Sequence, residues 1–131
     1  MRYLLDVNAL IAFGISRHQF HQRVVDWIMS QHGSKFLTTP VTEIGFVRVV
    51  SSVPIYDLNV SRARTLLLGM KENATRPLAF LPDNNDILVI PEWVSAPAQV
   101  TDGHLARLAI EHEALLATLD EQIPGSFLIP R

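Results

Sequence analysis

The chain has 131 residues, of which 48% are hydrophobic and 18% are charged, and its formal net charge is -2. These values predict one globular domain over residues 1–131, argue against a disordered tail and give no global sign of a nucleic-acid binder. The absence of cysteine excludes disulfides and thiolate metal sites. No apolar run approaches the ~20 residues of a membrane span, and no signal peptide precedes the first strand, so we expect a cytoplasmic protein.

The first apolar run, from Tyr3 to Leu10, is typical of a central strand in a parallel sheet. Asp6 falls at the carboxyl end of this strand, where open α/β sheets bind their ligands. A carboxylate beside the core needs a hydrogen-bonding partner or a cation. Asp6 or Asn8 would also suit a helix cap, so this run alone leaves capping and function open.

Predicted helices and strands alternate along the rest of the chain. After a short helix or turn at Leu10–Ile15, we predict a helix at Gln19–Gln31, a strand at Phe36–Thr39, and a helix to Val50 with Thr39 as its N-cap and Pro40 in its first position. We next predict a helix capped by Ser61 and an edge strand at Leu78–Leu81, and we leave the segment Pro82–Pro97 unassigned. The last predicted elements are a helix opening at Val100–Asp102 and strands at Leu115–Leu119 and Phe127–Ile129. This alternation predicts a three-layer α/β/α fold with a parallel sheet.

Four acidic residues are expected at the carboxyl edge of this sheet. Asp6 and Asp120 each end a strand, whereas Asp102 and Glu43 lie in the first turns of two helices. Glu43 also falls on the apolar stripe of its helix, and such a break in pattern tends to mark a site. Each acid alone has a structural explanation as a cap, a turn residue or a surface residue. A purely structural interpretation requires all four explanations to hold independently, although all four acids are expected at the same edge of the sheet. This coincidence favours a functional site.

Four carboxylates in one pocket raise their own pKa values by repulsion, and a divalent cation removes that repulsion. Because all of the ligands are oxygen atoms, the pocket favours Mg²⁺ or Mn²⁺. Such a site supports phosphoryl chemistry, in which the metal activates a water molecule and stabilises charge on phosphate oxygens. The residues therefore predict a metal-dependent phosphodiesterase.

Four segments resemble the PIN-domain ribonucleases and, within them, the VapC-type toxins of prokaryotic toxin–antitoxin pairs: Leu4–Ile11, Thr39–Arg48, Val100–Ala106 and Leu116–Asp120. The resemblance implies a PIN-like sheet of strand order 3-2-1-4-5 and an endoribonuclease that needs Mg²⁺ or Mn²⁺. It makes Asp6, Glu43, Asp102 and Asp120 the catalytic and metal-binding acids, with Asn8 and Thr118 orienting them. It also implies an RNA substrate, a cognate antitoxin that blocks the site, and a homodimer.

The remaining candidate residues are interpreted as structural, except Arg48, for which two roles are open. Arg48 is a candidate contact for phosphate or antitoxin, and a surface salt bridge explains it equally well. His18, His21 and Trp27 are interpreted as packing and helix-start residues, because a hard-cation site does not require histidine. His104 is interpreted as structural. No basic residue follows Asp120, where the family more often has one.

Three other functions share parts of this pattern. An aspartyl-phosphate phosphatase also carries an acid at the end of its first strand, but it needs a second acid at the position of Asn8 and a lysine near the site. A phosphoacceptor receiver domain has the same fold class, but it needs paired acids after its first strand, and this chain has Asn8 in place of the second acid. The non-enzymatic alternative is a PIN-like module that binds RNA or a partner without cutting, although such a module has no need of four mutually repelling carboxylates.

Overall fold

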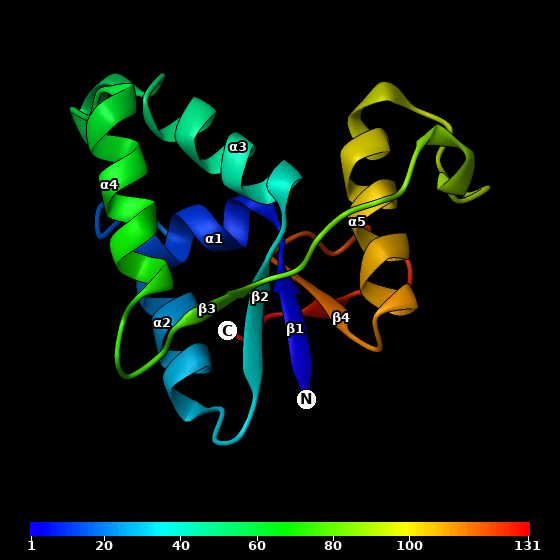
Figure 1. The fold of residues 1–131 in the computed structure, drawn as a ribbon, viewed down its shortest axis with the longest axis horizontal. Coiled ribbons are helices and arrows are strands. Elements are labelled where there is room, and N and C mark those ends of the chain that lie inside the picture. The colour runs from blue at the N-terminus through cyan, green and yellow to red at the C-terminus, as the bar shows by residue number, and fades with distance from the viewer.

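The computed structural model describes residues 1–131 as a five-stranded parallel sheet in the order β3-β2-β1-β4-β5, with helices on both faces (Figure 1). The strands are β1 (Arg2–Leu5), β2 (Lys35–Thr38), β3 (Leu78–Phe80), β4 (Leu115–Thr118) and β5 (Phe127–Leu128). The helices are α1 (Val7–Gly14), α2 (His21–Ser30), α3 (Pro40–Val50), α4 (Val60–Lys71) and α5 (Val100–Glu111), with short 3-10 turns η1 (Pro54–Tyr56), η2 (Ile87–Val89) and η3 (Pro97–Gln99). The predicted three-layer α/β/α fold and its strand order are confirmed.

The sheet separates two hydrophobic cores of unequal size. The larger core has 18 buried residues and joins the sheet to α1, α2, α3 and α4, whereas the smaller has 10 and joins it to α5 (Figure 1). Alternate residues of β1 divide between them, because successive side chains of a strand point to opposite faces. Tyr3 and Leu5 belong to the larger core, and Leu4 to the smaller one.

The first strand is shorter than predicted. β1 ends at Leu5, and the apolar residues that follow form α1, whose N-cap is Asp6. A continuous apolar run does not distinguish a buried strand from a buried helix. The Ala9 backbone N–H donates to Asp6 Oδ1 at 2.8 Å, and this bond marks the boundary.

One of the two predicted helix caps is wrong. Thr39 does precede α3, with Pro40 in the first helical position, and its backbone N–H donates to the Thr42 hydroxyl at 3.0 Å. The N-cap of α4 is Asn59 rather than Ser61, because the Asn59 side chain accepts from the Arg62 backbone N–H at 2.8 Å. Two cap-forming residues stand within three positions here, and the sequence pattern alone favoured the wrong one.

The unassigned segment between β3 and α5 packs against α5. His104 Nε2 lies 2.5 Å from Asp83 Oδ2, and Asn85 donates to Glu111 at 3.0 Å. An added Cβ on Gly103 would lie 2.3 Å from Val94 Cγ2, so the segment touches the helix backbone directly. The segment therefore supports the first turn of α5, and His104 has the structural role expected of it.

None of the helices combines the length and the hydrophobicity that a membrane crossing requires.

Candidate functional site

Asp6 is the buried acid at the carboxyl edge of the sheet, with 5% of its surface exposed. Its Oδ1 accepts from the Ala9 backbone, and its Oδ2 accepts from the Thr118 hydroxyl at 2.5 Å. Burial raises the pKa of Asp6 to about 6 despite these two hydrogen bonds, and the charges of Asp102 and Asp120 raise it further. Asp6 thus caps α1. Burial and two nearby negative charges also disfavour its ionised form, and a helix cap alone does not require an acid in such a place.

Asp102 and Asp120 approach Asp6 from two other elements. Asp102 lies in the first turn of α5 and is half-buried, and its pKa is raised by burial and by the charge of Asp120. Asp120 follows β4 and is exposed, and its backbone N–H donates to the Thr118 hydroxyl at 3.0 Å. None of the four ion pairs in the structure includes Asp6, Asp102 or Asp120. These three residues, the acid trio, therefore repel one another without a counter-charge.

Glu43 has a different environment. Its Oε2 accepts from the Thr38 hydroxyl at 2.5 Å and lies 2.9 Å from Lys71 Nζ. It is not among the groups that raise the pKa of Asp6. Of the four predicted acids, the structure brings three within charge-interaction range and gives the fourth its own cation. No three acidic or histidine side chains converge closely enough in this structure to surround a single metal ion.

The two predicted supporting residues differ in their contacts. Thr118 is fully buried, and its hydroxyl donates to Asp6 and accepts from the Asp120 backbone, so it links two members of the acid trio. Asn8 is exposed and lies beside Asp120 in a surface groove. Sequence reasoning missed Thr38 and Lys71 as partners of Glu43. An ion pair between helices leaves no local pattern, although Lys71 is one of only two lysines.

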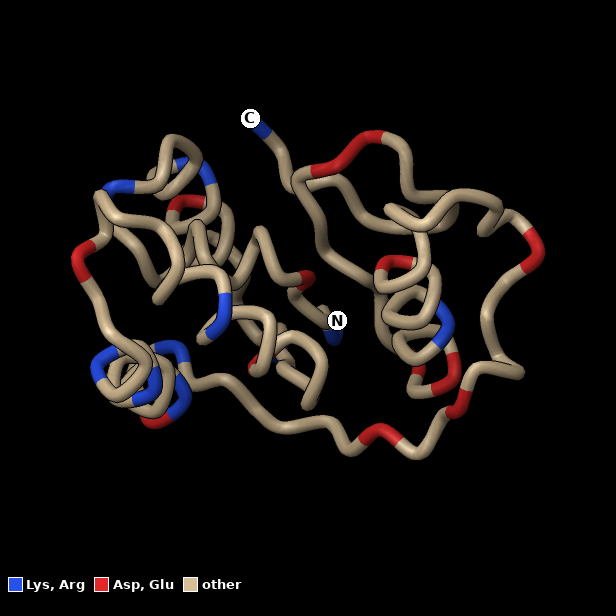
Figure 2. Tube along the Cα trace, turned by 90° about the horizontal axis from the view of Figure 1, so that it is seen from above, with Lys and Arg blue, Asp and Glu red and all other residues tan.

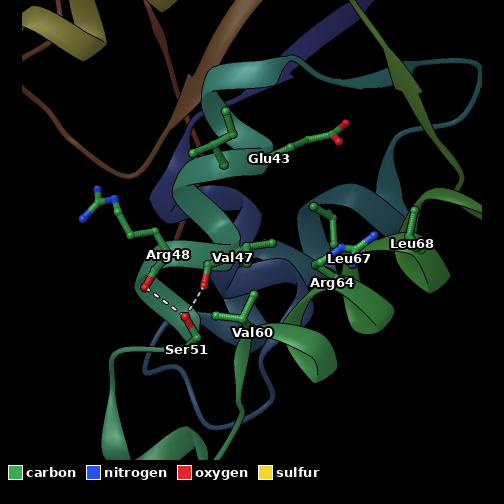
Figure 3. A pocket seen from close by; sticks show the side chains of 9 residues that line it. Glu43, Val47, Arg48, Ser51, Val60, Arg64, Leu67 and Leu68 are labelled. Atoms are coloured by element: carbon green, nitrogen blue, oxygen red, sulfur yellow. Dashed lines mark hydrogen bonds between the residues drawn. The ribbon is translucent and has the colours of Figure 1, made fainter.

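A groove of about 580 Å³ lies between α3 and α4, and Glu43 lines it (Figure 3). Its other lining residues are Ile44, Val47, Arg48, Ser51, Val60, Arg64, Leu67 and Leu68. The groove is mostly apolar, with two arginines among its lining residues. Figure 3 shows the Arg48 side chain extending away from α4, at the outer edge of α3. We call this surface the α3–α4 groove.

Comparisons with known proteins agree with this fold. The family model of the PIN domain matches residues 3–124. Ribonuclease VapC44 of Mycobacterium tuberculosis is 35% identical over 127 residues, which cover 94% of this chain and 89% of that protein. Ribonuclease VapC39 of the same organism is 31% identical over 130 residues, which cover 96% and 94%.

Two solved structures share the fold at lower identity. The crystal structure of VapBC2 from Rickettsia felis, bound to a DNA fragment from its promoter, superposes with a TM-score of 0.63 at 13% identity, covering 98% of this chain and 97% of that chain. FitAcB from Neisseria gonorrhoeae superposes with a TM-score of 0.56 at 24% identity, covering 95% and 90%. At these identities the likeness establishes the fold alone.

Proposed function

The chain belongs to the PIN domain family, and we propose that it is a metal-dependent endoribonuclease acting as the toxin of a toxin–antitoxin pair. Its similarity to proteins named ribonuclease VapC, over almost the whole of both chains, supports the reaction class. The observation that carries the proposal is the buried Asp6 carboxylate, whose pKa burial and two neighbouring acids raise to about 6. A fold that keeps such a group without a counter-charge is suited to binding a cation there.

The oxygen donors of the acid trio suit Mg²⁺ or Mn²⁺, and side-chain movement would bring them together on one ion, since they do not converge closely enough to surround it in this structure. Asp6, Asp102 and Asp120 offer only oxygen ligands, which hard divalent cations prefer. They also lack the Lys or Arg partner that would otherwise neutralise them. We assign Glu43 to the same site as the acid at its edge, where Lys71 offsets its charge.

The residues of the chain have separate roles in the proposed reaction. When bound, the cation lowers the pKa of a water molecule and stabilises negative charge on the phosphate oxygens. Thr118 holds the Asp6 carboxylate through its hydroxyl and the Asp120 backbone through its oxygen. The segment that packs on Gly103 holds the first turn of α5, and with it Asp102. Asn8 lies beside Asp120, where it would contact the RNA strand.

The distribution of charge supports an RNA substrate better than the net charge does. Nine of the eleven Lys and Arg residues lie in residues 1–81, whereas eight of the thirteen Asp and Glu residues lie in 82–131. Figure 2 shows most of the blue positions on the α4 side of the molecule and most of the red ones on the α5 side, with red positions also lying among the blue ones. A phosphate backbone would therefore lie over the basic side, with the cut phosphate at the acid trio.

The proposed protein partner is an antitoxin, which the resemblance to VapC-type toxins implies. We assign it to the α3–α4 groove, where Ile44, Val60 and Leu68 are each more than half exposed. Large apolar side chains on adjacent helices form the kind of groove that binds an amphipathic segment. Arg48 at the edge of this groove would pair with an acidic side chain of the antitoxin.

A homodimer is also part of the proposal. Ile87 and Leu88 are 71% and 87% exposed in the segment before α5, and a second copy of the chain would cover them. Sedimentation of the isolated protein measures the oligomeric state. A monomer at all accessible concentrations would contradict this part of the proposal and leave the reaction unaffected.

RNA cleavage by the purified protein tests the reaction. We expect cleavage of structured RNA with Mg²⁺ or Mn²⁺, no cleavage with excess chelator, and loss of cleavage in Asp6→Asn with an unchanged circular dichroism spectrum. Glu72→Gln is the matched control, because Glu72 follows the last residue of α4 and takes part in none of the four ion pairs. Tight RNA binding without any cleavage would instead favour a non-catalytic PIN-like binding module.

A further inference from the structure

A second groove includes Asp120 in its lining. It has a volume of about 390 Å³ and is lined by Asn8, His18, Gln19, Phe20, Leu119 and Asp120. We call it the loop groove, because three of its residues belong to the loop between α1 and α2. Its volume lies in the range of pockets that bind small ligands. The sequence favours packing and helix-start roles for His18, and the structure places this residue in the lining of the groove.

Hydrogen-bonding groups dominate the lining of the loop groove. The amides of Asn8 and Gln19 each offer both donors and an acceptor. The backbone N–H of Phe20 donates to His18 Nδ1 at 3.0 Å, so in the neutral ring the proton resides on Nε2, which is then a donor. The Phe20 ring supplies an apolar wall and is 37% exposed.

The wall of the loop groove is held in place by the rest of the fold. The Arg23 guanidinium lies over the Phe20 ring, 5.5 Å from its centre, and Arg23 Nε donates to the Ile129 carbonyl at 3.1 Å. The loop itself is closed by two backbone hydrogen bonds of 3.0 Å, from His18 to Ile15 and from His21 to His18. A groove whose wall is already ordered loses little conformational entropy when it binds a ligand.

The charge of the loop groove selects its ligand. No Lys or Arg is among its lining residues and Asp120 is, and the nearest guanidinium, that of Arg23, lies over the Phe20 ring, so the lining itself offers a phosphate group no cation. A neutral, planar, polar group fits better, because it can lie against Phe20 and bond the amides at its edge. Proteins recognise unpaired RNA bases in this way, through an aromatic contact and edge hydrogen bonds.

We propose that the loop groove binds the nucleobase next to the phosphate that is cut, with Asn8, His18 and Gln19 bonding its edge and Phe20 contacting its face. The proposal rests on the ribonuclease function proposed above. Asp120 connects the two sites, because it belongs both to the acid trio and to the groove. The groove would then contribute to the choice of RNA sequence.

Binding of single nucleosides tests the groove without any cleavage. The isotope-labelled wild-type protein is titrated, in the absence of metal, with each of the four ribonucleosides while its backbone amide signals are recorded. We expect the signals of His18, Gln19, Phe20 and Leu119 to shift, and one nucleoside to shift them at a lower concentration than the others. Shifts at other places only, or shifts at the groove with the antitoxin but with no nucleoside, would overturn the proposal.

Cleavage by variants separates this inference from the proposed function. Gln19→Ala removes an exposed amide and leaves the fold intact, Phe20→Ala removes the wall, and His32→Ala is the control, an exposed histidine in the turn between α2 and β2. We expect KM to rise roughly tenfold in Phe20→Ala and severalfold in Gln19→Ala, with broader base preference at the cut ends and no change in His32→Ala. Unchanged KM and unchanged ends in both variants, in a protein that cuts RNA, would refute the groove alone. If the wild type cuts no RNA, the proposed function fails first.

Discussion

Lys71 Nζ lies 2.9 Å from Glu43 Oε2, and this ion pair joins the last residue of α4 to the first turn of α3. The two side chains are 23% and 21% exposed, so solvent screens the pair only in part. Glu43 therefore has a counter-charge, whereas Asp6, Asp102 and Asp120 have none. The four acids consequently differ in how strongly each should attract a cation.

We expect Asp6→Asn and Glu43→Gln to weaken metal binding unequally. Asp6→Asn removes the most buried charge of the acid trio and should lower the affinity for Mn²⁺ by tenfold or more. Glu43→Gln should lower it by no more than about fivefold, because Lys71 already offsets that charge. Isothermal titration with Mn²⁺ measures both. Equal losses in the two variants would mean that the ion pair opens when metal binds.

Removal of Lys71 should have the opposite effect. In Lys71→Met the Glu43 carboxylate loses its cation, and we expect the affinity for Mn²⁺ to rise about two- to fivefold, in line with the strength of a partly exposed ion pair. The rise should disappear in the Lys71→Met, Glu43→Gln double variant. A rise that persisted in the double variant would assign the effect of Lys71 to another group.

Asp6 should make the metal-free protein less stable as the pH rises. Its pKa is raised from 3.8 to about 6, so the folded state binds more protons than the unfolded state between these values. The stability contributed by this proton is fully present below pH 3.8 and is lost as the pH rises through 6. The loss is about 3 kcal/mol. Asp102 adds to it in the same direction, because its pKa is also raised.

Urea unfolding of the metal-free protein between pH 4 and pH 8 measures this effect. Asp6→Asn should flatten most of the decline and should make the protein more stable than the wild type at pH 7. Added Mg²⁺ should raise the melting temperature of the wild type at pH 7 more than that of Asp6→Asn. The difference in stability between Asp6→Asn and the wild type isolates Asp6 from carboxyls of lowered pKa such as Asp83, and a difference that does not grow from pH 4 to pH 7 would contradict the assignment of a raised pKa to Asp6.

The Thr118 hydroxyl should be needed for the position of Asp6. Thr118→Val removes the donor to Asp6 and the acceptor for the Asp120 backbone, and we expect a loss of about 1–3 kcal/mol of stability. In the wild type the hydrogen bond from Thr118 lowers the pKa of Asp6, so the loss of this bond should raise that pKa above its wild-type value. Carbon-13 NMR of the Asp6 carboxyl measures the shift. Thr118→Ser keeps the hydroxyl and should behave like the wild type.

Gly103 should be essential for the position of Asp102. In Gly103→Ala the new Cβ would lie 2.3 Å from Val94 Cγ2, so either the helix or the segment must move, with a loss of about 1–3 kcal/mol. Metal affinity should fall as well, because Asp102 precedes this glycine in the first turn of α5. Gly69→Ala is the matched control, since it lies in α4 with nothing within 4 Å. It should be neutral or stabilising by up to about 1 kcal/mol.

Much of the fold follows from pattern, because buried parallel strands appear as apolar runs and helices as periodic ones. The proximity of Asp6 and Asp120 is predictable, since each ends such a run and the topology of a parallel sheet brings strand ends to one edge. The end of β1 was not predictable, because strand and helix are there equally apolar. The contact of Lys71 with Glu43 and the support of α5 by the preceding segment join distant residues, and neither leaves a periodic signal.

The division of the interior by the sheet has a consequence for how the molecule opens. Asp6 lies between Leu5 and Ala9, which belong to the 18-residue core. The buried hydrophobic residues of α5, the helix that carries Asp102, belong to the 10-residue core. Regions with fewer buried contacts undergo local unfolding more readily than the whole protein does. Transient detachment of α5 would separate Asp102 from Asp6 and Asp120 while the remaining helices stayed folded. Hydrogen exchange should therefore be faster in α5 than in α1, and inactivation on warming should precede global melting.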